Sequence, residues 1–150
     1  MEISNDHAVK VLNSLIETTL DSANGYREAA ESAQSLQYTT MFSDRATRRT
    51  QLVGELQQEV RSFGGSPETD QSFLGKAHNK FVDLKNALVG GDDRAVINEV
   101  ERGEDFIKAK FEAVLEDHDL PTPVRDLINR AYGAIKADHD EVSRLKHQLN

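Results

Sequence analysis

The sequence predicts an all-α protein that folds as a bundle of four long helices. Apolar residues recur at spacings of three and four along four long stretches, which is the period of a helix with one buried face. Glycine and proline interrupt these stretches at a few places, where helices end. No stretch shows the alternating pattern rich in β-branched residues that indicates a strand.

The first two predicted helices occupy the N-terminal half of the chain. The first begins near Ser4 or Asn5, both good N-cap residues, and extends to about Gln34. Its buried stripe comprises Leu12, Leu15, Ile16, Thr19, Ala23, Tyr26, Ala30 and Ala33. The second begins near Ser35, and its stripe comprises Met41, Phe42, Ala46, Leu52, Val53, Leu56, Val60 and Phe63. It ends at Gly64-Gly65-Ser66-Pro67, because glycine caps a helix and proline cannot continue one.

Two further long helices occupy the C-terminal half. Asp92 caps the first of them, whose stripe comprises Ala95, Val96, Val100, Gly103, Ile107, Phe111, Val114 and Leu115. A break at Leu120-Pro121-Thr122-Pro123 follows, with Thr122 as N-cap and Pro123 at the first helical position. The stripe of the last helix comprises Val124, Leu127, Ile128, Ala131, Ile135, Val142, Leu145 and Leu149.

A shorter amphipathic helix is predicted between the two pairs, from about Asp70 to Val89. Short loops near Ser35 and Pro121 make each pair of long helices antiparallel. The middle helix measures roughly 28 Å at 1.5 Å per residue, which is close to enough to return the chain along the bundle. A four-helix bundle with one long crossover is the ferritin-like arrangement, and an up-down-up-down bundle of five helices is the alternative.

Length and composition restrict the classes of function. The 150 residues predict a single domain over 1–150, with 37% hydrophobic and 29% charged residues, as in a soluble protein with a core. The absence of cysteine excludes disulfides and thiolate metal sites. A net charge of −8 repels phosphate backbones and anionic lipids, so we expect neither nucleic acid nor a membrane as the main partner. The N-terminus has no basic region followed by an apolar run, so we expect no signal peptide and a cytoplasmic location.

Three of the long helices place an ionisable residue on or beside the apolar stripe at mid-length. Arg49 falls on the stripe of the second helix, and Glu104 on the flank of the stripe that begins at Ala95. The stripe of the last helix passes between Asp138 and His139, with Lys136 one turn before the histidine. Each of these groups would cost several kcal/mol if it were buried unpaired, so the layer requires internal partners.

Two interpretations of this polar layer remain open. One is a metal site, for iron or another divalent metal, built from Glu104 and His139. The other is a closed set of ion pairs, in which Arg49 and Lys136 face Glu104 and Asp138. A lone histidine on an apolar face is more often a hydrogen-bonded structural residue than a ligand, which favours the second interpretation.

Several segments resemble the carboxylate bundles of the rubrerythrin and ferritin type, which bind two metal ions with six ligands. These segments are Tyr26 with Ala29-Ala30, Met41-Phe42 with Ala46, and Gly103-Glu104. At the ligand positions of those proteins, this chain matches only at Glu104 and His139. Arg49 and Lys136 stand where carboxylates are expected, and Thr19 and Leu52 replace two further ligands. The resemblance therefore implies a bundle in which positive side chains supply the charge of the missing metal ions.

A second resemblance covers nearly the whole chain. It is carried by Leu12-Asn13-Ser14-Leu15-Ile16-Glu17, Gly25-Tyr26-Arg27-Glu28-Ala29-Ala30-Glu31, Gly54-Glu55-Leu56-Gln57-Gln58-Glu59-Val60, Gly75-Lys76-Ala77-His78 and Glu101-Arg102-Gly103-Glu104-Asp105. In these stretches the chain is similar to an uncharacterised bacterial family of ferritin-like bundles, known only as a domain of unknown function. Asn79 and Phe81 stand where that family tends to have Arg and Trp. The family supplies no catalytic residue to carry over.

Glycines inside helices indicate close packing at several points. Gly75 lies one turn before His78 on the crossover helix, where a small residue lets the helix approach the bundle and His78 hydrogen-bond across it. Gly25 and Gly54 each cost about 1 kcal/mol relative to alanine within a helix. We therefore expect a neighbouring helix close to them, either within the bundle or in a dimer.

These observations favour a non-catalytic, metal-free, ferritin-like bundle with a structural or binding role. We expect a homo-oligomer, with a dimer favoured, and no cofactor; family analogy adds a link to bacterial stress responses. The alternative is an enzyme, either a divergent metal-dependent oxidase or a metal-storage subunit. Such a protein would use Glu104 and His139 with further ligands such as Glu28 or Glu101.

Overall fold

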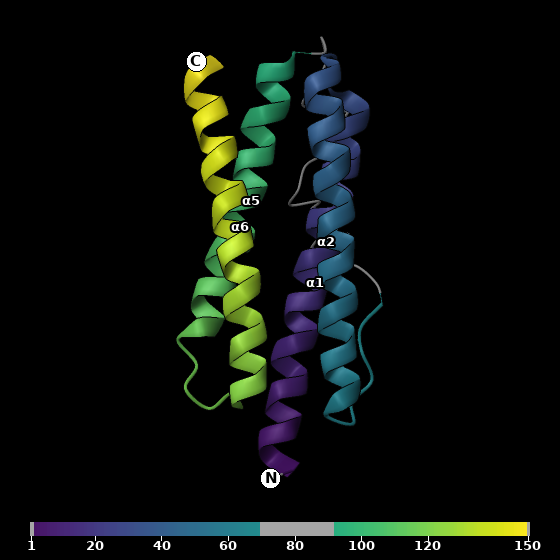
Figure 1. Ribbon diagram of the computed structural model, residues 1–150, viewed down its shortest axis with the longest axis vertical. Coiled ribbons are helices and arrows are strands. Elements are labelled where there is room, and N and C mark those ends of the chain that lie inside the picture. The colour runs from purple at the N-terminus through teal and green to yellow at the C-terminus, as the bar shows by residue number, and fades with distance from the viewer. Residues whose placement is uncertain (1, 70–91, 150) are drawn as a thin grey trace.

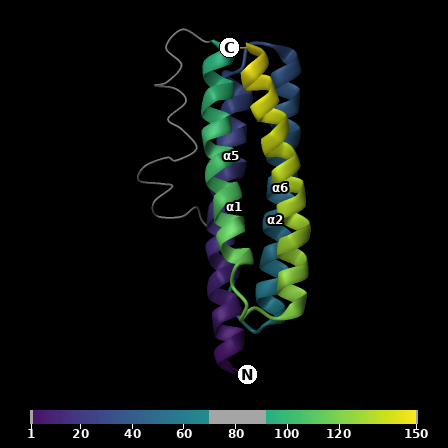
Figure 2. The same ribbon diagram turned by 90° about the vertical axis from the view of Figure 1, so that its left-hand side faces the viewer.

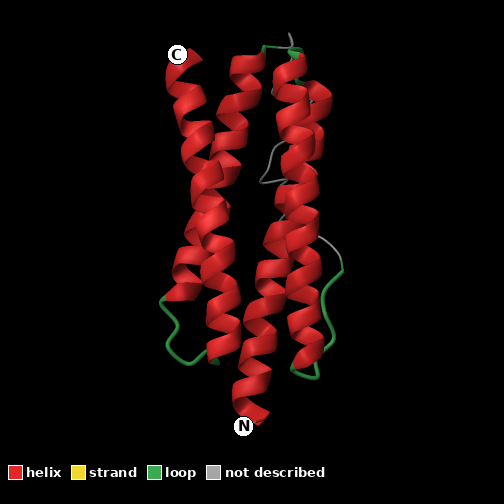
Figure 3. Cartoon of the chain, viewed as in Figure 1, coloured by secondary structure: helices red, strands yellow, loops and turns green. Residues whose placement is uncertain are grey.

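The computed structural model describes residues 2–69 and 92–149, and it arranges them as four helices in one bundle (Figures 1 and 3). The helices are α1 (Glu2–Ser32), α2 (Leu36–Ser62), α5 (Asp93–Leu115) and α6 (Thr122–Leu149). The predicted all-α bundle is confirmed. The predicted crossover helix, including Gly75 and His78, lies outside the described residues. None of the helices described is long and apolar enough to span a membrane.

Local sequence explains where these helices begin and end. Asp92 is the N-cap of α5, as predicted, and its carboxylate accepts a hydrogen bond of 2.9 Å from the backbone N–H two residues later. The loop after α2 turns at Gly64, whose φ of +79° lies in the left-handed region that glycine adopts without strain. Asp93 accepts hydrogen bonds from the backbone N–H groups of Gln34 and Ser35, which join the α1–α2 turn to the start of α5.

The direction of the helices defines the topology. Figures 1 and 2 show two antiparallel pairs, α1 with α2 and α5 with α6. α2 and α5 run in the same direction, because α2 ends at one end of the bundle and α5 begins at the other. Two consecutive long helices can be parallel only if the chain crosses over along the bundle between them. The topology is therefore ferritin-like and not up-down-up-down.

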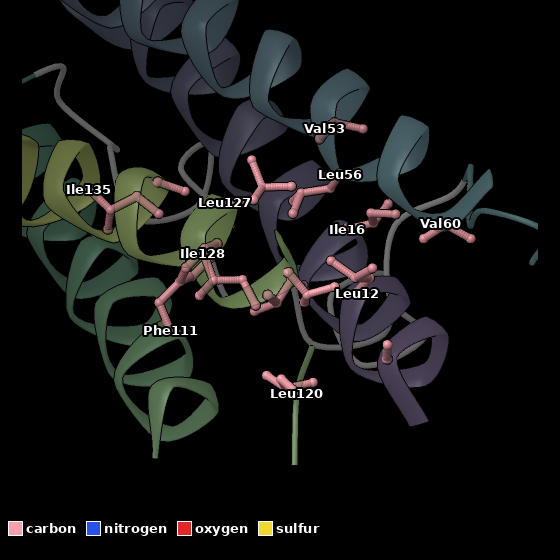
Figure 4. Close-up of a cluster of buried hydrophobic side chains, with 14 of the residues drawn as sticks. Leu12, Ile16, Val53, Leu56, Val60, Phe111, Leu120, Leu127, Ile128 and Ile135 are labelled. Carbon is pink, nitrogen blue, oxygen red and sulfur yellow. The ribbon is translucent and has the colours of Figure 1, made fainter. Parts of the chain in front are cut away.

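The core consists of two hydrophobic clusters, one toward each end of the bundle. The larger cluster contains residues from all four helices, among them Leu12, Leu56, Phe111 and Ile128 (Figure 4). The smaller cluster comprises Tyr26, Ala29, Phe42, Ala46, Val96, Ile97, Val100 and Val142. On every helix a buried polar residue separates the two clusters. These separating residues include Ser22, Arg49, Glu104 and Asp138.

Two glycines behave differently in this packing. A Cβ atom at Gly65 would lie 2.7 Å from both methyl carbons of Val9, so the loop after α2 lies directly against α1. Among the described residues, no atom outside the local backbone of α2 would lie within 4 Å of a Cβ atom at Gly54. In this part of the chain the small size of Gly54 therefore serves no close approach between helices, and a neighbour in a dimer stays a prediction.

Candidate functional site: a buried ion-pair layer

Arg49 of α2 lies at the centre of the polar layer. Its side chain is 3% exposed, and that of Glu104, from α5, is fully buried. The two groups form a bidentate pair, with Nη1–Oε1 and Nη2–Oε2 distances of 2.8 and 2.9 Å. Nη1 also donates to Ser22 Oγ of α1 at 2.7 Å, and Nη2 to Asp138 Oδ2 of α6 at 3.1 Å. One guanidinium group therefore contacts side chains from the three other helices.

A second arginine, one turn earlier on α2, extends the layer toward the smaller cluster. Arg45 is also 3% exposed, and its Nε atom lies 3.4 Å from Asp138 Oδ1. Its Nη1 atom donates to the Tyr26 hydroxyl at 3.3 Å, and its Nη2 atom to the Glu141 carboxylate. From the solvent side, the half-exposed Arg48 donates to Asp138 Oδ1 at 3.3 Å. Asp138 thus lies among three guanidinium groups.

The charges of the layer balance. Two buried cations, Arg45 and Arg49, face two buried carboxylates, Glu104 and Asp138. The more exposed Arg48 and Glu141 add one charge of each sign. Each of these four buried charges therefore has an oppositely charged neighbour, which is the condition under which ionised groups persist in a protein interior.

Tyr26 completes the layer from α1. The guanidinium carbons of Arg45 and Arg49 lie 5.6 and 5.4 Å from the centroid of its ring, within the range of cation–π attraction. Burial and the negative charge of Glu104 raise the pKa of Tyr26 well above its usual value, so its hydroxyl is neutral. Burial alone would lower the pKa of Arg49, but the charge and hydrogen bonds of Glu104, together with Tyr26 and Asp138, outweigh this effect, and the net shift of the pKa is upward.

These side chains do not fit a divalent metal ion. Both oxygens of Glu104 accept hydrogen bonds from Arg49, and both oxygens of Asp138 accept from arginines. A metal ion would have to displace guanidinium groups that cannot lose their charge. In the part of the chain that the structure describes, no group of three or more His, Asp or Glu side chains is arranged to hold a metal ion. The layer neutralises charge and links helices; it presents no free carboxylate.

The structure brings Arg49, Glu104 and Asp138 together, but the prediction for Lys136 requires a correction. The Lys136 side chain is 53% exposed and pairs with Asp140 at 3.1 Å on the surface of α6. The physical reason is helical geometry, because a residue two positions from Asp138 projects about 200° around the helix axis from it. The cation expected from position 136 is supplied by Arg45 of α2.

His139 likewise lies outside the layer. Its side chain is 17% exposed, and its Nε2 atom lies 2.6 Å from Asp105 Oδ1 of α5. Its Nδ1 atom lies 3.2 Å from Asp140 Oδ1. Glu104 and His139, the two residues of the alternative metal site, therefore contact different partners.

Sequence reasoning missed Arg45, Ser22 and the role of the Tyr26 hydroxyl. A signal for Arg45 was present, because it precedes Arg49 by four residues and so shares its helix face. Ser22 is placed three residues after Thr19 and four before Tyr26, which puts it on the predicted stripe of the first helix. Tyr26 is predicted as a residue of the buried stripe and of the segment that resembles rubrerythrin, but a pattern of apolar spacing does not show where a hydroxyl finds its partner.

The pair of His139 and Asp105 predicts a pH-dependent contribution to stability. Burial lowers the pKa of His139, but the hydrogen bonds with Asp105 and Asp140 outweigh it, and the net shift is upward. A histidine whose pKa is higher in the folded state adds stability below its unfolded pKa of about 6.5, and this stability is lost as pH rises through the folded pKa. Wild-type protein should therefore exceed His139→Gln in free energy of unfolding by more at about pH 5.5 than at about pH 8.5. Urea unfolding at both pH values measures this, and equal differences would contradict it.

The helix directions and the central layer define the molecule as a ferritin-like helical bundle. The chain belongs to the family described as domain of unknown function DUF2383, whose match covers residues 7–117. A search of curated proteins gives no match.

Several solved structures are similar in fold. A mutant of Dps1 from Mycobacterium smegmatis superposes with a TM-score of 0.82 at 11% sequence identity, over 97% of this chain and 99% of that one. A two-domain protein from Anabaena variabilis, with DJ-1/ThiJ/PfpI-like and ferritin-like domains, superposes with a TM-score of 0.77 at 15% identity. That alignment covers 97% of this chain but 40% of the two-domain protein. At these identities the likeness shows the ferritin-like fold alone.

Proposed function

We propose that this protein is a non-catalytic, metal-free, ferritin-like bundle with a structural or binding role. The observation that supports this most directly is the bidentate pair of Arg49 and Glu104 at the centre of the bundle. The guanidinium group supplies permanent positive charge, because arginine is not deprotonated in proteins. Unlike a metal ion, it neither dissociates nor changes oxidation state.

The role we propose for the layer is to fix how the four helices align. Arg49 contacts Ser22, Glu104 and Asp138, each on a different helix. A shift of α2, α5 or α6 by one turn would leave at least one buried charge without its partner, and such a charge is costly. A shift of α1 would instead remove the hydrogen bond between Arg49 and Ser22. In this proposal the layer therefore selects one arrangement of the bundle against its alternatives.

The proposal includes a homodimer in the bacterial cytoplasm that works without a cofactor. The net charge of −8 supports partners other than nucleic acid and anionic membranes. A link to bacterial stress responses is the part of the proposal that depends solely on the family resemblance.

Metal analysis tests the metal-free proposal. Protein purified aerobically, incubated with excess iron, manganese or zinc and then desalted should retain far less than one metal ion per chain by elemental analysis. The chain should also consume oxygen with added Fe²⁺ no faster than buffer does. His139→Ala is the matched variant, because it removes the histidine of the rival site and leaves the Arg49 layer intact. Near-stoichiometric metal in the wild type that is lost in His139→Ala would contradict the proposal.

A further inference from the structure

An exposed stripe on α2 follows the spacing of a helix–helix interface. Its members recur at intervals of three and four residues, and every one is exposed: Asp44, Thr47, Gln51, Gly54, Gln58 and Arg61. This spacing places them on one face of the helix, opposite the buried arginines. From its first to its last member the stripe measures roughly 26 Å. We call it the α2 stripe.

The α2 stripe is complementary to itself when reversed. Suppose that the α2 helix of a second copy lies antiparallel, with a two-fold axis between Gln51 and Gly54. Residues equally distant from the axis then face each other across it. Asp44 faces Arg61, Thr47 faces Gln58, and Gln51 faces Gly54, each pair occurring twice. This is the isologous form that two-fold interfaces require.

The charges at the two ends of the stripe support this arrangement. Within residues 2–69 and 92–149, neither Asp44 nor Arg61 forms a side-chain ion pair, whereas Arg45, Arg48 and Arg49 of the same helix all do. In the antiparallel pairing each of these two charges meets an opposite charge. In a parallel pairing Asp44 would meet Asp44 and Arg61 would meet Arg61, which is repulsive. The charge pattern therefore selects the antiparallel orientation.

The middle of the stripe provides room for a second helix. Glycine weakens a helix, and within residues 2–69 and 92–149 no atom of a neighbouring helix lies close enough to Gly54 to require it there. A hollow of about 640 Å³ between α1 and α2 is bordered by Thr47 and Gln51, and one of about 730 Å³ between α2 and α6 by Gly54 and Gln58. The surface is thus lowered on both sides of the stripe, where the side chains of a second copy would enter.

We propose that the α2 stripe is the interface of a two-fold symmetric homodimer in which two α2 helices pack antiparallel. We assign a second copy of this chain as the partner, because the α2 stripe is complementary in charge and size to an antiparallel copy of itself. This inference rests on the homodimer in the proposed function and names its surface. It does not depend on whether the bundle binds metal.

Charge exchange tests the interface. Sedimentation velocity on the full chain, from about 1 to 500 µM, should show a dimer for the wild type. Asp44→Arg alone, or Arg61→Asp alone, should raise the dimer Kd by about tenfold or more, since each places like charges at both ends of the interface. The double variant Asp44→Arg/Arg61→Asp should restore a Kd near that of the wild type. Arg144→Asp is the matched control for Arg61→Asp, because Arg144 is exposed on α6 and its substitution changes the net charge by the same amount; the dimer Kd should not move.

A bulky residue in place of Gly54 should weaken association without weakening folding, so it distinguishes the two effects. Gly54→Met should fold at least as stably as the wild type, because methionine favours the helix and meets open space within the bundle. Its dimer Kd should nevertheless rise by about tenfold or more, since the side chain fills the place of Gln51 from the second copy. A wild type that stays monomeric would overturn the interface and assign this face to solvent or to another partner. A dimer unaffected by both the charge variants and Gly54→Met would overturn it too. Metal analysis decides the metal-free proposal separately.

Discussion

Arg49→Ala should lower the free energy of unfolding by about 3–5 kcal/mol, the loss expected when one partner of a buried ion pair is removed. Among the described residues, Glu104 accepts side-chain hydrogen bonds from Arg49 alone, and it is fully buried. The variant leaves this carboxylate in the core without a counter-charge, next to the negative charge of Asp138. Urea unfolding followed by far-ultraviolet circular dichroism, at neutral pH, measures the difference.

A double variant separates the cost of a broken pair from the contribution of the intact one. Arg49→Met combined with Glu104→Leu removes both charges and keeps similar volume, so it should recover most of the loss. Arg48→Ala is the matched control; Arg48 is 52% exposed, and among the described residues its ion pair is with Asp138, so we expect a change of about 0–1 kcal/mol. If Arg49→Ala were no more destabilising than Arg48→Ala, the central role of the Arg49–Glu104 pair would be wrong.

Most of the fold was predictable because several local signals agree. Asp92 begins a helix by capping it, Gly64 ends one by adopting positive φ, and apolar residues recur at helical spacing between such points. Helix lengths and one long connection then restricted the topology to a few choices. The direction of α5 relative to α2 decided among them, and it depends on contacts between helices that no local pattern encodes.

The polar layer was harder to predict, because a step of one residue turns a side chain by about 100° around the helix axis. The stripe of the last helix passed between Asp138 and His139, and only the position of the arginines on α2 favours Asp138. Lys136 was paired on the basis of charge alone, although it projects away from the core. Arg45 supplies the missing cation because its Nε atom lies 3.4 Å from Asp138 on another helix. The sequence alone does not show which residues of different helices come this close.

Phe111→Ala should produce the second large effect, a loss of about 3–5 kcal/mol in the free energy of unfolding. Phe111 is fully buried in the larger cluster, where Figure 4 shows it beside Ile128. Truncation removes most of the ring from a close-packed region and leaves a cavity that the surrounding helices fill only partly. Urea unfolding measures the loss. Phe106→Ala is the matched control: Phe106 lies on the same helix but is 37% exposed, so we expect a change of less than about 1 kcal/mol.

The same measurement on Phe42→Ala, in the smaller cluster, shows whether the ion-pair layer couples the two halves of the core. Arg49 lies between the two clusters and contacts side chains from α1, α5 and α6. Neither half of the core can therefore unfold without breaking the ion pairs of Arg49. We therefore expect each variant to unfold in a single transition with a lower midpoint urea concentration. The slope of the free energy of unfolding against urea concentration should stay unchanged. Near-ultraviolet signals from tyrosine should coincide with far-ultraviolet signals from the helices. A separate early transition in Phe42→Ala would show that the layer divides the core rather than joining it.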